Sequence, residues 1–203
     1  MGRRKGDRTH GRYVSNPRVW QCEDVFLEDE LYSDDRYEWF RGKLLLPDEE
    51  KVASWVEDTY YTHANGMGLR WLATMTKTDY TRLSRWFRGE WSIQYNDVLK
   101  LIKFCNSLIG EPEHRRPMFT SDDEIRDILH HMKLHNFRYV NPSYVTWRHD
   151  WSEESYWKWY RGEAERGLTY RKMKGYLDTV LFEYEAVKYV YDRGKRYEAM
   201  IIA

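Results

Sequence analysis

One four-residue string occurs three times in the 203-residue chain, as Trp39-Phe40-Arg41-Gly42, Trp86-Phe87-Arg88-Gly89 and Trp159-Tyr160-Arg161-Gly162. Tryptophan, an aromatic residue, arginine and glycine in a constant order indicate an internal structural repeat, because a triple coincidence is improbable even in a chain with 10 tryptophans. A glycine that follows a helix commonly adopts the left-handed conformation that ends it. We therefore expect each of the three tryptophans to be buried near the end of a short helix.

Apolar residues flank the strings at helical spacing. Leu69, Leu72 and Ala73 precede the central string, and an apolar stripe from Val98 to Cys105 follows it. This spacing predicts an all-α fold built from small helix-turn-helix-like units of about 45 residues each. The expected organisation is a basic N-terminal arm at 1–18, an acidic unit at 19–65, a central unit at 66–110, a linker at 111–118, and a third unit with a C-terminal helix at 119–203.

The formal net charge of zero conceals a strong charge pattern along the chain. The arm carries six basic residues against Asp7, and residues 19–65 carry thirteen acidic residues against four basic ones. Residues 66–110 carry seven basic residues against three acidic ones. Long-range attraction to a polyphosphate is therefore expected only at the arm and the central unit.

The central unit contains Leu72-Ala73, then Lys77-Thr78-Asp79, and then Leu83-Ser84-Arg85-Trp86-Phe87-Arg88-Gly89-Glu90. In these residues the chain resembles the lambda-repressor-like helix-turn-helix family, most clearly over residues 69–106. Asp79 suits the N-cap of the second motif helix, because its side chain can accept a hydrogen bond from the first turn. The family commonly has glycine where Lys77 stands. Lys77 must therefore adopt the left-handed conformation, or the turn must differ.

The resemblance implies that the second motif helix enters the major groove of duplex DNA. Arg82 or Arg85 would then donate two hydrogen bonds to guanine, and Thr81 would contact a base edge. Lys77 and Arg88 suit contacts to phosphate, and the arm could follow the backbone or a minor groove. The candidate DNA-binding residues are Tyr80, Thr81, Arg82, Arg85, Lys77, Arg88, Arg3, Arg4 and Lys5.

The flanking units have different surfaces. In the acidic unit, Asp34, Asp35 and Glu38 take the groove-facing positions and would repel phosphates, so residues 33–41 are not expected to contact nucleic acid. A protein partner bound through 19–65 is one alternative, and a solvated acidic face is an equal one. In the third unit Ser152 is the expected N-cap, and Trp157 is left at least partly exposed.

Other functions find little support in the sequence. No catalytic set, phosphate-binding glycine loop or metal-ligand spacing occurs, and the pair His131 and His135 lacks the further ligands of a tetrahedral site. We therefore expect no enzyme activity, no cofactor and no metal ion. No apolar run approaches the roughly 20 residues that span a bilayer, so no membrane association is expected.

Two interpretations follow. The first is a DNA-binding regulator that reads duplex DNA through the central unit, and the resemblance implies a phage or bacterial protein of the cytoplasm. The second is a protein-binding or structural component, such as a virion part or an inhibitor, that reuses the same fold. The operator sequence, the oligomeric state and the direction of regulation stay open.

Overall fold

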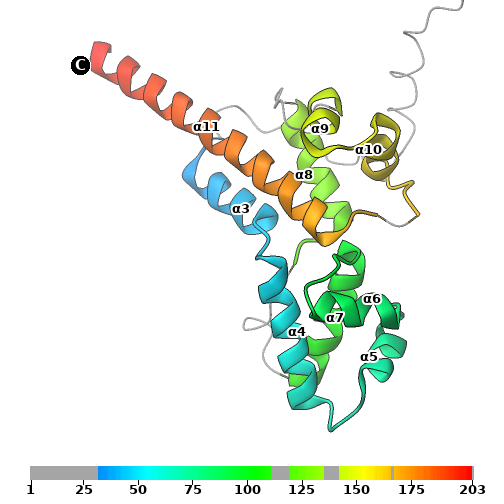
Figure 1. Ribbon diagram of the computed structural model, residues 1–203. Coiled ribbons are helices and arrows are strands. Elements are labelled where there is room, and N and C mark those ends of the chain that lie inside the picture. The colour runs from blue at the N-terminus through cyan, green and yellow to red at the C-terminus, as the bar shows by residue number, and fades with distance from the viewer. Residues whose placement is uncertain (1–31, 111–118, 135–141, 166, 203) are drawn as a thin grey trace, which may run out of the picture.

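The computed structural model describes residues 32–110, 119–134, 142–165 and 167–202 (Figure 1). Within these ranges it contains nine helices and no strand, which confirms the predicted all-α fold for this part of the chain. Figure 1 shows α4–α7 in the lower half and α8–α11 in the upper half, with α11 lying along α3. The helices are α3 (Asp34–Leu44), α4 (Glu49–His63), α5 (Leu69–Thr76), α6 (Tyr80–Phe87), α7 (Tyr95–Ile109), α8 (Asp122–Leu134), α9 (Pro142–His149), α10 (Glu153–Tyr160) and α11 (Tyr170–Ile202).

Eight of these helices form two copies of one four-helix pattern. Helices α4, α5 and α6 begin at residues 49, 69 and 80, and α8, α9 and α10 each begin 73 positions later. The fourth helix of the second copy, α11, begins 75 positions after α7, because the loop before it is two residues longer. We call α4–α7 the first repeat and α8–α11 the second repeat.

The helix–turn–helix parts of the two repeats share their backbone details. Lys77 and Asp150, at equivalent positions between the two motif helices, have φ angles of 54° and 50°. The glycines of the second and third strings, Gly89 and Gly162, both have a φ of 70°. The main-chain N–H that follows each glycine donates back into the last helical turn, at 2.9 and 2.8 Å, as in a Schellman motif. The turns and helix ends around the second and third strings therefore have matching backbone geometry.

A buried hydrogen bond ties the third helix of each repeat to the first residue of its first helix. Trp86 is 2% exposed, and its Nε1 donates to Oε1 of Glu49 at 3.1 Å. Trp159 is 1% exposed, and its Nε1 donates to Oδ1 of Asp122 at 3.0 Å. The burial expected for these two tryptophans is confirmed, and each carboxylate satisfies an indole N–H that burial removes from water.

The repeats meet through two short antiparallel segments, residues 93–95 and 168–170. A single β-bridge joins their central residues, and the main-chain N–H groups of Tyr95 and Tyr170 each donate to the opposite segment at 2.8 Å. The two tyrosine rings pack together with centroids 5.9 Å apart. Because each segment gives the other the same contact, the two repeats are related here by an approximate two-fold axis.

The tyrosine hydroxyls repeat this exchange. The hydroxyl of Tyr95 donates to the carbonyl of Thr120 at 2.7 Å, and the hydroxyl of Tyr170 donates to the carbonyl of Pro47 at 2.9 Å. Thr120 lies 73 positions after Pro47, so the acceptors are equivalent as well. Burial raises the pKa of both tyrosines, and both therefore stay protonated donors.

The first string does not follow the pattern, and the expectation that Trp39 is buried is wrong. Its side chain is 39% exposed, and the neighbouring Phe40 is buried instead. Gly42 lies inside α3, which continues to Leu44, so this glycine does not end the helix. Phe40 is buried in place of Trp39 because α3 packs against α11 and α8. Phe40 and Leu44, four positions apart, form the face of α3 that is buried there.

The acidic surface of α3 has an intramolecular partner in α11. Lys188 forms an ion pair with Asp34 at 2.8 Å, and this hydrogen bond lowers the pKa of Asp34. The Tyr37 hydroxyl donates to Glu185 at 2.9 Å. Helix α4, which the sequence analysis assigned to 19–65, packs on α6 and α7 and is the first helix of the first repeat. Within the described ranges, the helices form two repeats and one additional helix, α3, and the expected arrangement of three tandem units is not confirmed.

The glycines provide a direct test of this correction. A Cβ atom would meet nothing within 4 Å at Gly42 or at Gly89, so only the backbone conformation distinguishes the two positions. Gly42→Ala should raise the free energy of unfolding by roughly 0.5–1 kcal/mol, because alanine is favoured inside a helix. Gly89→Ala should lower it by about 1–2 kcal/mol, because alanine is strained in the left-handed region. Urea denaturation followed by circular dichroism measures both. Equal effects would contradict the difference between the first and second strings.

The tyrosine exchange predicts a matched pair of effects. Tyr95→Phe and Tyr170→Phe should each lower the free energy of unfolding by about 1 kcal/mol, because each leaves a main-chain carbonyl without its donor. Tyr61→Phe, at an exposed position, is the control and should change nothing. A loss from only one of the two buried variants in the same denaturation assay would contradict the two-fold relation.

Candidate nucleic-acid interface

Four buried residues set the orientation of α6 on α5. Leu72 and Ala73 of α5 face Leu83 and Trp86 of α6, and all four are at most 4% exposed. The spacing of Leu83 and Trp86, three positions apart, places one stripe of α6 against the core. The opposite side of α6 is consequently presented to solvent.

The turn between the helices is tight because Lys77 adopts the left-handed conformation, with φ 54° and ψ 38°. Its main-chain N–H donates to the last carbonyls of α5, and its side chain is exposed. Of the two outcomes that the sequence left open, the structure has the left-handed lysine. The Thr78 hydroxyl lies 2.9 Å from that of Thr76, which in turn donates to the Leu72 carbonyl at 2.8 Å.

Asp79 is the N-cap of α6, as expected. Its Oδ1 accepts a hydrogen bond from the main-chain N–H of Arg82 at 2.8 Å. The remaining N–H groups of the first turn give this end of the helix a partial positive charge. The exposed end of α6 therefore favours an anionic group even before its side chains are considered.

The residues expected to face bases lie together at this end of α6. Thr81 and Arg82 are exposed, and Tyr80 is 43% exposed with the Arg70 guanidinium carbon 5.4 Å from its ring centroid. Arg85 is half-buried one turn further along. These side chains form a mixed aromatic and cationic surface on one rigid helix, which suits base-edge and phosphate contacts.

Trp91 also belongs to this surface, and the sequence analysis missed it. The Arg85 guanidinium carbon lies 4.2 Å from the centroid of the Trp91 ring, which is itself 48% exposed. A guanidinium that stacks on an indole is held in place and has lost part of its conformational freedom before it meets a ligand. In the sequence, the feature that points to this contact is the alternation of arginine and aromatic residues across the end of α6.

The residues expected to contact phosphate are only partly brought together. Lys77 is exposed beside the turn. Arg88 forms an ion pair with Glu90, at 3.1 Å between Nε and Oε1, which reduces its capacity for phosphate. Arg3, Arg4 and Lys5 lie outside the described residues.

The second repeat has the same turn conformation but carries carboxylates at three of the matching positions. Asp150 stands at the position of Lys77, and Glu153 and Glu154 stand at the positions of Tyr80 and Thr81. All three carboxylates are exposed. Lys158, at the position of Arg85, pairs with Glu154 at 2.7 Å, and this hydrogen bond lowers the pKa of Glu154. The first turn of α10 therefore carries two carboxylates where α6 carries the uncharged Tyr80 and Thr81.

The described residues contain no group of three histidine, cysteine, aspartate or glutamate side chains placed to hold a metal ion. Burial raises the pKa of the Cys105 thiol to about 12, which makes it a poor nucleophile. None of the helices in the described ranges combines the length and apolarity needed to cross a membrane. No protein-family model, characterised protein or solved structure matches the chain.

The left-handed lysine generates a stability prediction. Lys77→Gly should raise the free energy of unfolding by up to about 1 kcal/mol, because glycine removes the strain of the left-handed region. Asp150→Gly should behave in the same way, since its φ is 50°. Lys103→Gly, in the middle of α7, is the control and should cost about 1 kcal/mol. Thermal and urea denaturation report all three, and a destabilising Lys77→Gly would contradict the turn geometry.

Proposed function

We propose that the protein is a DNA-binding regulator that reads duplex DNA through α6 of the first repeat. The observation that carries the proposal is the exposed N-terminal half of a capped helix, with Thr81 and Arg82 pointing away from the buried stripe of Leu83 and Trp86. A rigid helix with exposed polar side chains at its first turn is the element that helix-turn-helix proteins insert into the major groove. The proposal also rests on the sequence resemblance to the lambda-repressor-like family.

The parts of the surface would act differently on DNA. Arg82 has the side chain that can donate two parallel hydrogen bonds to guanine O6 and N7, which gives sequence discrimination. Arg85, already stacked on Trp91, would bind a base edge or a phosphate with little further loss of entropy. Lys77 and the basic arm would add attraction that is independent of sequence and decreases with salt.

Only one of the two repeats is proposed to bind DNA. Placing α10 in a groove would bring Asp150, Glu153 and Glu154 close to phosphates, which is repulsive. One chain would therefore read a single, asymmetric site, although its two repeats are related by an approximate two-fold axis. A chain with one DNA-binding helix-turn-helix does not require a palindromic DNA site in order to bind as a single chain.

The role of the α6 surface can be tested with a matched pair of variants. Arg82→Ala should weaken binding to a duplex selected from a random pool by about 1–3 kcal/mol, because a contact to a base edge is lost. Ser155→Ala, at the equivalent position of α10, should leave the affinity unchanged. Fluorescence anisotropy at several salt concentrations measures the Kd of each variant for the selected duplex and for random duplexes.

The same series contains the result that would refute the proposal. Arg82→Ala should keep a folded circular dichroism spectrum, since the side chain is exposed. If no duplex is preferred over the random pool, or if Ser155→Ala weakens binding as much as Arg82→Ala, α6 is not the reading helix. A regulatory role in a bacterial or phage-infected cell would then lose its basis as well.

A further inference from the structure

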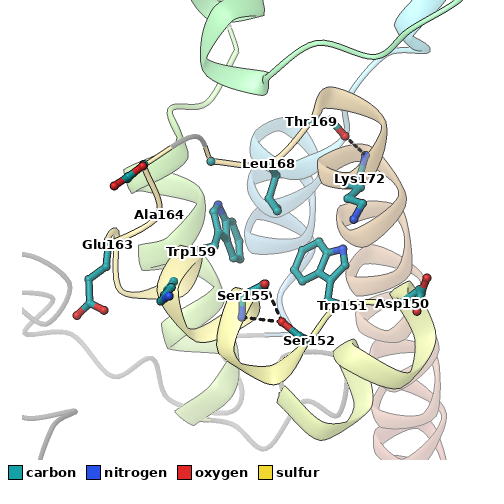
Figure 2. A pocket seen from close by; sticks show the side chains of 13 residues that line it. Asp150, Trp151, Ser152, Ser155, Trp159, Glu163, Ala164, Leu168, Thr169 and Lys172 are labelled. Atoms are coloured by element: carbon teal, nitrogen blue, oxygen red, sulfur yellow. Dashed lines mark hydrogen bonds between the residues drawn. The ribbon is translucent and has the colours of Figure 1, made fainter.

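An open cavity of about 790 Å³ lies beside α10 in the second repeat, and the loop that leads into α11 forms part of its lining (Figure 2). Trp151 and Trp159 also line it, with ring centroids 5.9 Å apart, although the two side chains are only 7% and 1% exposed. Figure 2 shows the two rings next to the Leu168 side chain, with Ser152 and Ser155 at the start of α10 below them. The volume is within the range of about 300–1,000 Å³ that ligand sites occupy.

The first repeat has an indole, 48% exposed, at the position where the second repeat has alanine. Trp91 lies two residues after Gly89, and Ala164 lies two residues after Gly162. The ring of Trp91 packs against the Arg85 guanidinium at 4.2 Å, and Lys158 holds the position of Arg85 in the second repeat. Alanine at position 164 thus removes the indole that covers this side of the motif in the first repeat.

In the second repeat, the residues around the position of Trp91 have clear counterparts. Trp159 is the counterpart of Trp86, and both Ala164 and Lys158 line the cavity. The loop from Gly162 to Tyr170 is two residues longer than the one from Gly89 to Tyr95, which leaves Leu168 and Gly167 at the edge of the opening. Compared with the first repeat, the second repeat therefore lacks an aromatic ring at this position.

We propose that the cavity binds an aromatic side chain, tryptophan or tyrosine, presented by a partner protein, in the place that Trp91 takes in the first repeat. Such a ring buries a large apolar area for little conformational entropy, which makes it the usual anchor of a protein interface. The Lys158 ammonium, which pairs with Glu154, adds a cation to the cavity that can face the ring as Arg85 faces Trp91.

The charges of the cavity favour a protein over a nucleic acid. Asp150, Glu163 and Glu165 contribute three carboxylates to the lining, against Lys158 and Lys172. Lys158 pairs with Glu154 and Glu163 pairs with Arg161, which leaves the carboxylates of Asp150 and Glu165 against Lys172. A nucleobase stacked in the cavity would bring its phosphates close to them, whereas a peptide brings no such charge.

The probe for this site is N-acetyl-tryptophanamide, which presents one indole and no net charge. In ¹⁵N-correlated NMR spectra of the full chain, its titration should produce saturable shifts at the amides of Ala164, Gly167 and Thr169, with a stoichiometry of one. N-acetyl-leucinamide should bind at least ten-fold more weakly. Ala164→Trp should fill the cavity and weaken binding of the indole probe at least ten-fold. A single-stranded oligonucleotide should cause no shift at these amides.

A reciprocal variant keeps the proposal testable if Ala164→Trp fails to fold. Trp91→Ala removes the indole of the first repeat, and it should create a second site beside Arg85 and raise the probe stoichiometry from one to two. No saturable shift at the three amides, equal binding of the leucine probe, or an oligonucleotide bound at the cavity would overturn the proposal. Absence of a second site in folded Trp91→Ala would overturn the equivalence on which it rests.

Discussion

The two repeats depend on one hydrogen bond, from a buried tryptophan indole to a carboxylate at the start of a helix. A buried N–H without an acceptor is costly, so Trp86 and Trp159 can occupy the core only where Glu49 and Asp122 meet them. The bond connects the end of the third helix of each repeat to the beginning of its first. It thereby sets how α6 and α10 lie on their units, and which residues of each are presented to solvent.

The sequence predicted much of this, and the exposure of Trp39 has a physical explanation. Both acceptors stand 37 positions before their tryptophans, whereas the residue 37 positions before Trp39 is Gly2, whose side chain can accept nothing. Trp39 is 39% exposed, and α3 buries Phe40 and Leu44 instead.

The candidate site was predicted in part. The N-cap at Asp79, the buried pair Leu83 and Trp86, and the exposure of Arg82 all follow from local spacing and capping chemistry. The stacking of Arg85 on Trp91 does not, because it depends on the path of the chain after the glycine. Nor could spacing alone reveal the cavity, which exists because of a missing ring and two additional loop residues.

The shared backbone leaves the exposed surfaces of α6 and α10 free to differ. The backbone restricts only the buried stripe, the cap and the left-handed positions, so the exposed residues were free to become basic in one copy and acidic in the other. Under the proposed function, only the first repeat would contact DNA.

The most direct test is a map of the DNA contact on the full chain. Amide shifts measured by ¹⁵N-correlated NMR during titration with a selected duplex should be concentrated at residues 77–85. Residues 150–158 should show none, and the shifts should decrease as salt is raised. Equal shifts in both segments, or shifts confined to 150–158, would contradict the assignment of DNA binding to the first repeat.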